Sequence, residues 1–440
     1  MNILPNIVFC LLLIIAVGFF TINIRKLIRN IRLGKSEDTS DNRPQRWKNM
    51  FRIALGQGKM TVRPVAGILH ILVYLGFIII NLEMLEIILD GIFGTHRLFS
   101  FLGSFYNVLI GSFEILAFLV IISVTVFWIR RNIFKINRFQ KEELRNWAKR
   151  DGNIILYIEA ILMFLFLTMN AADFRLQQLG VEPYLQAGIF PISQWISQLM
   201  YHFPQSALIA IERTCWWLHI IGVLCFLNYL YYSKHLHIIL AFPNTFFAST
   251  RPQGALKVNQ TVLKEVKLML DPTADPFATT EENANPPEKF GASDVFDLTW
   301  VQLLNAYTCT ECGRCTDECP ANLTGKKLSP RNIMMKTRDR LEEVSKNIDS
   351  NKGIFKEDSK QLLNDYITPE ELWACTSCNA CVEACPVSIN PLSIIMDMRQ
   401  YLVMEQSAAP KELNNMMSNI ENNGAPWAYS RSDRMNWVQE

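Results

Sequence analysis

Five long apolar stretches before residue 235 limit the fold more strongly than any other feature of the sequence. They run at about Pro5–Ile24, Val65–Leu89, Asn107–Ile129, Asn153–Ala172 and Leu208–Tyr232. Each is close to the ~20 residues that a helix needs to cross ~30 Å of hydrocarbon at ~1.5 Å per residue. Lipid cannot hydrogen-bond to the backbone, so the N–H and C=O groups of such stretches must bond to each other, as they do in helices packed in a bundle. The sequence therefore predicts an all-α membrane protein with a five-helix transmembrane bundle.

Basic residues gather in alternate connections between these stretches. Residues 25–63 and 130–150 are rich in Arg and Lys, whereas the other two connections are nearly bare. By the positive-inside rule, the N-terminus lies outside a bacterial inner membrane, and everything after the fifth helix lies in the cytoplasm. Arg25, Lys26 and Arg29 directly follow the first stretch, which favours a retained anchor over a cleaved signal peptide.

Histidines in the second and fifth stretches indicate a b-type haem. Two histidines that face each other on neighbouring bundle helices form a common axial pair. If the fifth helix continues to Pro243, His235 and His237 lie at the depth of His70. We expect His237 to pair with His70, with His235 as the rival ligand. The alternative is that His235 and His237 contact lipid phosphates at the membrane surface.

A second haem has less support in the sequence. His219 lies deeper in the fifth stretch, but no histidine stands near residue 80, where its partner on the second helix is needed. His96 and His202 fall in connections and are expected to be solvated.

Several carboxylates lie within the predicted helices, where they are costly in lipid and so should face the bundle interior. They are Glu83, Glu86, Glu114 and Glu159. Glu83 and Glu86 are candidates for a quinone site, although pairing with polar groups of the bundle explains them equally well.

The second half of the chain carries two copies of one cysteine pattern. Cys309-x-x-Cys312-x-x-Cys315-x-x-x-Cys319-Pro recurs as Cys375-x-x-Cys378-x-x-Cys381-x-x-x-Cys385-Pro. This is the spacing of two [4Fe–4S] clusters, in which the fourth cysteine of each run binds the other cluster. The crossed assignment places Cys385 with the first three cysteines and Cys319 with the second three.

Zinc and disulfides explain the cysteines less well. Zinc sites use pairs of cysteines in the spacing CxxC, without a third cysteine at the same spacing, and disulfides are rare in the cytoplasm.

We therefore divide the chain into a transmembrane domain at 1–243, a linker at 244–295 and a mainly helical cytoplasmic dicluster ferredoxin domain at 296–440. The net charge of +2 argues against nucleic acid as a partner.

Three segments carry a resemblance to known families. GILH around His70 and WWLHIIG…YYSKHLHIILAFPN up to Asn244 resemble the cytochrome b (gamma) subunit of respiratory nitrate reductase and the membrane subunit of heterodisulfide reductase. The segment from Phe290 to Pro330 resembles the iron–sulfur part of heterodisulfide-reductase-like membrane proteins. Such proteins commonly add cysteine-rich CCG domains, which here are expected on a separate protein. They also often hold two haems.

The resemblance implies an electron-transfer subunit of a quinone-linked oxidoreductase. Electrons would pass between a cytoplasmic partner and the quinone pool through two [4Fe–4S] clusters and haem b. The partner is expected to be a CCG-type iron–sulfur subunit or an electron-transfer flavoprotein, and quinone reduction is the expected direction. A membrane-anchored iron–sulfur redox sensor and a subunit of an ion-pumping redox complex are the alternatives.

Overall fold

The computed structural model describes residues 3–273 and 289–438, and part of the predicted linker lies outside them. The described residues form helices and turns, with no β-strand among them. Five helices are long and apolar enough to cross a membrane. They are α1 (Leu4–Ile31), α3 (Pro64–Phe93), α4 (Ser104–Asn132), α5 (Trp147–Gln178) and α7 (Gln205–Tyr229). The predicted five-helix bundle is thus confirmed; the first four helices extend beyond their apolar stretches at both ends, whereas α7 ends at Tyr229, before the end of its stretch.

Shorter elements connect the bundle helices. On the side of the basic connections these are α2 (Arg43–Asn49), the π-helical turn η1 (Met50–Leu55), η3 (Asn137–Phe139) and η4 (Glu142–Leu144). At the opposite end they are η2 (Leu98–Leu102) and α6 (Ser193–Gln198). Of the four carboxylates expected to face the bundle interior, Glu83, Glu86 and Glu114 are buried, and Glu159 is partly buried.

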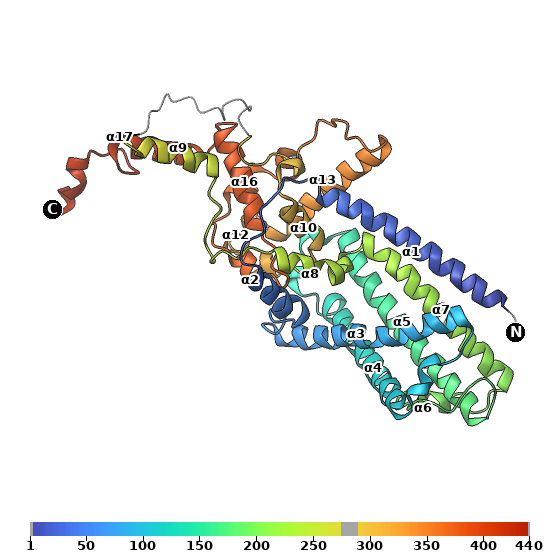
Figure 1. Cartoon of the computed structure of the whole chain (residues 1–440). Helices are drawn as coiled ribbons and strands as arrows, with labels where there is room; N and C mark the ends of the chain where they lie inside the picture. Colours follow the sequence, from blue (N-terminus) through green and yellow to red (C-terminus); the bar gives the residue numbers. More distant parts are fainter. Residues whose placement is uncertain (1–2, 274–288, 439–440) are drawn as a thin grey trace.

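The first helix lies along one side of the bundle and reaches the second half of the chain (Figure 1). It packs against α3 and α7. At its C-terminal end, Asn30 Nδ2 donates to the Tyr307 hydroxyl at 2.9 Å. Arg29 pairs with Asp349 at 2.5 Å. These contacts join the start of the chain to residues far along it.

The fifth bundle helix does not continue to Pro243, which was the condition for placing His235 and His237 at the depth of His70. It ends at Tyr229 and is followed by the 3₁₀ turns η5 (Leu230–Tyr232) and η6 (Lys234–Leu236), then by α8 (His237–Phe247). Between the two turns the backbone of Ser233 is extended, and its hydroxyl accepts a hydrogen bond from the His235 amide. Asp151 Oδ2 accepts from the Lys234 amide at 3.1 Å. A side-chain cap and a carboxylate from α5 therefore hold the chain in a turn where the sequence pattern predicts continuous helix.

The second half of the chain is a cluster of short helices around the two cysteine runs. They are α10 (Trp300–Thr308), α11 (Arg314–Asp317), α12 (Pro320–Leu323), α13 (Pro330–Ser350), α14 (Pro369–Trp373), α15 (Ala380–Ala384) and α16 (Pro391–Met404), with turns η8 (Val295–Asp297) and η9 (Leu362–Tyr366). Side chains of Thr299, Ser329, Thr368 and Asn390 cap α10, α13, α14 and α16. The predicted helical character of this half is confirmed.

Peripheral helices lie away from this body. They are α9 (Gln260–Leu270), α17 (Lys411–Asn423) and the terminal turn η10 (Arg431–Val438). In Figure 1 α17 and the C-terminus extend away from the bundle. The predicted domain limits stay a prediction, although α8 passes the one at residue 243.

One hydrophobic core joins the two halves. It contains Leu304, Val344 and Ile395 of the second half together with Leu27, Leu230, Leu236 and Leu240 of the first. Because burial of apolar surface is the main favourable contribution to folding, this shared core fixes the second half against one end of the bundle.

Arg340 on α13 is the strongest polar anchor of the second half. Its guanidinium is fully buried and pairs with Asp294 at 2.8 Å and Asp358 at 2.6 Å. It also donates to the carbonyl of Lys360. One side chain thus ties three segments together.

Replacing Arg340 by Met should lower the free energy of unfolding by about 3 kcal/mol, because two nearly buried carboxylates lose their counter-ion. Thermal unfolding of the purified chain, followed by circular dichroism, measures the effect. Lys360→Ala is the matched control, since its ion pair with Glu343 is exposed to solvent and its loss should leave the melting temperature almost unchanged. Equal melting temperatures for Arg340→Met and the wild type would contradict the anchoring role.

Candidate functional site

The first three cysteines of the first run meet the last cysteine of the second. Cys309, Cys312, Cys315 and Cys385 line one small cavity between α10, α11 and α15, and Cys381 lines it as well. The loop between α10 and α11 turns through Gly313, whose φ of +74° favours glycine. Burial and the neighbouring thiols of Cys312 and Cys309 raise the pKa of Cys385 to about 12.

The remaining four cysteines form a second group. Burial and the neighbouring thiols of Cys375, Cys319 and Cys378 raise the pKa of Cys381 to about 12. Cys319 and Cys381 are buried, whereas Cys378 is exposed. The structure thus brings Cys385 to the first three cysteines and Cys319 to the second three, which is the grouping that crossed ligation requires.

Four cysteine thiols in each group are the ligand set of a [4Fe–4S] cluster. No group of three or more His, Cys, Asp or Glu side chains within the described ranges is placed to hold a single metal ion. Four thiols around a small cavity repel one another as thiolates, and a cluster of iron ions between them removes that repulsion. These cysteines could therefore hold two [4Fe–4S] clusters.

The first cysteine group is the one that faces the bundle. Arg314 Nη1 donates to the carbonyl of Lys59 at 3.0 Å, in the connection that leads into α3. Asn244 Nδ2, on α8, donates to the carbonyl of Val387 at 2.7 Å, next to Cys385. The second group, with its exposed Cys378, lies on the solvent side.

A buried ion pair makes the shortest polar contact between the first cysteine loop and the bundle. Lys234 Nζ lies 2.6 Å from Glu311 Oε2, and Arg338 pairs with the other carboxylate oxygen at 2.6 Å. Burial alone would raise the pKa of Glu311, but Lys234 and Arg338 hold it at about 2. The carboxylate is therefore charged throughout the physiological pH range.

The same lysine orients a predicted haem ligand. The carbonyl of Lys234 lies 3.0 Å from His237 Nδ1. A hydrogen bond from Nδ1 to a carbonyl leaves Nε2 with the free lone pair that a metal needs. Burial lowers the pKa of His237, so the imidazole is neutral at pH 7, as a ligand must be.

His70 and His237 lie at the separation of two ligands to one metal. Their ring centroids are 6.4 Å apart. Metal–nitrogen bonds to histidine are about 2 Å long, so two rings that bind one ion from opposite sides have centroids about 6 Å apart. The predicted pair is thus brought together despite the broken helix. These two side chains could hold the iron of a haem.

Of the other two predicted histidines, His235 is a direct neighbour of this pair, whereas His219 lies apart from it. His235 packs on Phe226 and His237, and its Nε2 is 3.6 Å from the Glu159 carboxylate. His219 is buried in α7, with Nδ1 3.0 Å from the carbonyl of Leu162. The ring contact recorded for His219 is with Phe166. The structure brings no second histidine to His219 within the described residues, and the outer haem stays a prediction.

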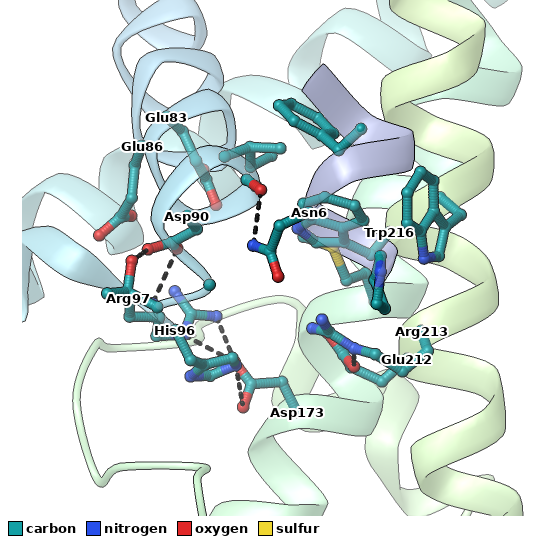
Figure 2. A pocket seen from close by; sticks show the side chains of 18 residues that line it. Asn6, Glu83, Glu86, Asp90, His96, Arg97, Asp173, Glu212, Arg213 and Trp216 are labelled. Carbon is teal, nitrogen blue, oxygen red and sulfur yellow. Dashed lines mark hydrogen bonds and ion pairs between the residues drawn. The ribbon is translucent and has the colours of Figure 1, made fainter. Parts of the chain in front are cut away.

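A polar cavity at the opposite end of the bundle was missed by the sequence analysis. Its volume is about 350 Å³, and it lies between the starts of α1 and α7 and the ends of α3 and α5 (Figure 2). His96, expected in solvent, instead lines this cavity and packs on Tyr184. The expectation was wrong because Arg97, beside it, is drawn into the bundle by Asp173 at 2.6 Å. The spacing of Glu83 and Glu86 was the only sequence signal of the cavity.

Comparisons with known proteins agree with the cysteine geometry. Residues 308–389 match the family model of the 4Fe-4S dicluster domain. The chain is 28% identical to "Probable iron-sulfur-binding oxidoreductase FadF" of Bacillus subtilis, over 97% of this chain and 59% of that protein. It is 27% identical to "EtfAB:quinone oxidoreductase" of Syntrophomonas wolfei, over 98% of this chain and 59% of that protein.

A shorter match is with "Probable membrane-anchored ferredoxin" of Chromohalobacter salexigens, 30% identical over 36% of this chain and 25% of that protein. This chain spans about three fifths of the length of the first two relatives. No solved structure matches it significantly. Together, the motif, the bundle and the relatives indicate an iron–sulfur electron-transfer protein of the membrane, of the oxidoreductase class.

Proposed function

We propose that this chain passes electrons between a soluble cytoplasmic redox protein and the quinone pool, using two [4Fe–4S] clusters and one b-type haem. The observation that carries the proposal is the succession of sites from solvent to membrane. The cysteine group that contains the exposed Cys378 is nearest to solvent, and the group that contains Cys385 follows it. Lys234 and the histidine pair of His70 and His237 come next, towards the membrane. The bound groups supply one-electron transfer, and the chain supplies their spacing and surroundings.

The residues of each site have distinct tasks. Cys375, Cys378, Cys381 and Cys319 would hold the cluster nearer solvent, and Cys309, Cys312, Cys315 and Cys385 the one nearer the bundle. His70 and His237 would hold the haem iron, with His235 as the rival. The side chain of Lys234 holds the first cysteine loop through Glu311, and its backbone carbonyl holds His237.

Different observations support the proposed partner and the proposed quinone. A relative named EtfAB:quinone oxidoreductase favours quinone and an electron-transfer flavoprotein. A heterodisulfide reductase component of Methanosarcina mazei, 28% identical over 34% of this chain, keeps a CCG-type iron–sulfur protein as the other candidate partner. The exposed aromatic side chains Trp427, Tyr429 and Trp437 near the C-terminus are where we expect such a partner to dock. An inner-membrane location with the cysteine half in the cytoplasm belongs to the same proposal.

The function itself is tested by reoxidation. The purified chain in lipid nanodiscs, reduced chemically, should be reoxidised by a short-chain naphthoquinone. Stopped-flow absorbance follows the iron–sulfur and haem bands. Bands that stay reduced in excess naphthoquinone would end the proposal.

The crossed cluster assignment predicts which cysteine variants resemble each other. Cys385→Ser should abolish the same electron paramagnetic resonance signal as Cys312→Ser, because both thiols belong to one cluster, whereas Cys378→Ser should abolish the other signal. Bound iron should fall by about half in each. Cys225→Ser, outside both motifs, is the control and should keep both signals. If Cys385→Ser and Cys378→Ser lose the same signal, each motif binds its own cluster.

The haem assignment predicts a ligand pair. His70→Ala and His237→Ala should each abolish the haem bound at this pair, because a single remaining imidazole leaves the iron without its second ligand. The reduced b-type absorbance per protein measures this loss. His202→Ala, an exposed histidine, is the control and should keep all haem. If haem absorbance is lost in His235→Ala but not in His237→Ala, the ligand is His235. An unchanged ratio of haem absorbance to protein in His70→Ala would refute the haem site.

A further inference from the structure

The cavity at the end of the bundle opposite the iron–sulfur half contains two polar side chains with an unsatisfied atom. Most carboxylates on its wall are fully engaged. Glu86 accepts from Tyr106 and the Phe99 amide, and Asp90 accepts from the amides of Arg97 and Leu98. Glu83 is different. It is 4% exposed, and its Oε2 has no hydrogen-bond partner.

His96 is the second such group. Its Nδ1 has no hydrogen-bond partner, while its Nε2 lies 3.9 Å from the Asp173 carboxylate. Burial lowers the pKa of His96 to about 4, so the ring is neutral at pH 7. Buried polar atoms are nearly always hydrogen-bonded, so two buried atoms without a partner, on residues that line one cavity, favour a ligand with polar groups.

The rest of the wall is aromatic and apolar. Phe9, Trp216 and Trp217 form a contiguous aromatic cluster, with ring centroids of Phe9 and Trp216 5.6 Å apart and of Trp216 and Trp217 5.1 Å apart. Ile87 and Met169 complete this side. A volume of about 350 Å³ suits an organic ring and is far larger than one ion needs.

The cavity lies next to lipid. Pro5, Asn6 and Phe9 of α1 line it, whereas Ile7 and Val8 on the same helix are exposed on the outer surface of the bundle. A single helix thus separates the cavity from the hydrocarbon. A ligand that dissolves in lipid can reach it past α1, because α1 packs on only one side.

We propose that this cavity binds the headgroup of a quinone, with Glu83 and His96 facing its two oxygens and the ring against Trp216. This inference rests on the proposed function and adds the position of the quinone in the bundle and the residues that donate protons to it. A quinone combines the required properties: a flat ring, two hydrogen-bond acceptors on opposite edges and a lipid-soluble tail.

The chemistry balances at this site. Reduction to quinol adds two electrons, delivered by the redox centres of the proposed function, and one proton to each carbonyl oxygen. Glu83 donates a proton to one oxygen and is reprotonated from the water side of the cavity. The second proton comes from water: His96 donates the proton of one ring nitrogen to the other oxygen and takes up a proton from water at its second ring nitrogen, so that the ring ends neutral. No other oxidant or reductant takes part.

The test uses the full chain in lipid nanodiscs and 2-methyl-1,4-naphthoquinone as the probe. Equilibrium dialysis measures binding, with empty nanodiscs to subtract partition into lipid, and stopped-flow absorbance measures reoxidation of the reduced chain. Trp216→Leu should weaken binding roughly tenfold, since the ring loses its aromatic face. Glu83→Gln should keep binding but slow reoxidation roughly a hundredfold, since the amide cannot donate the proton.

Glu182→Gln is the matched control, because Glu182 is exposed at the same end of the bundle and does not line the cavity. It should behave as the wild type. If Trp216→Leu and Glu83→Gln bind and react as the wild type does, the quinone site lies elsewhere and the proposed function stands. A wild-type chain that neither binds the probe nor is reoxidised by it would refute the proposed function itself, and this inference with it.

Discussion

The buried ion pair between Lys234 and Glu311 is the interaction on which the arrangement of the sites depends. Removing two charges from water is costly, and a buried pair is retained only where further hydrogen bonds satisfy it. Here Arg338 pairs with the carboxylate, and the carbonyl of Ala148 accepts from the ammonium group. Because Lys234 also presents its carbonyl to His237, one residue sets the position of the cysteine loop relative to the histidine pair. The broken helix makes this possible, since Lys234 then lies in a turn.

The two ends of the bundle use buried charge in different ways. At the end near the cysteines, the charges are paired across the boundary between the two halves of the chain. At the far end, Arg97 is buried with Asp173 and Asn170 inside the bundle, and a cavity remains beside them. Along α3, His70 and Glu83 are about 20 Å apart at 1.5 Å per residue. The bundle therefore separates the end that carries the histidine pair from the end that carries the cavity.

Local patterns predicted those features that depend on local geometry. The five helices follow from uninterrupted apolar runs, and the two cysteine groups follow from three-residue steps on a tight turn. The turn at Ser233 could not be predicted, because the segment contains no Gly or Pro and its conformation depends on Asp151 of another helix. The cavity could not be predicted either, since its wall combines Phe9, His96 and Trp216 from segments far apart in the chain. Contacts of that kind are visible only once the helices are packed.

The contacts of α1 have a consequence for biosynthesis. Asn30 is bonded to Tyr307, which is 277 residues further along the chain. At 5–20 residues per second, a ribosome needs about 15–55 s to cover that distance. During this interval the end of α1 is already at the membrane surface while its partners have not been made. The iron–sulfur half must therefore fold onto a bundle that is already inserted, and a segment made much later completes the packing of α1.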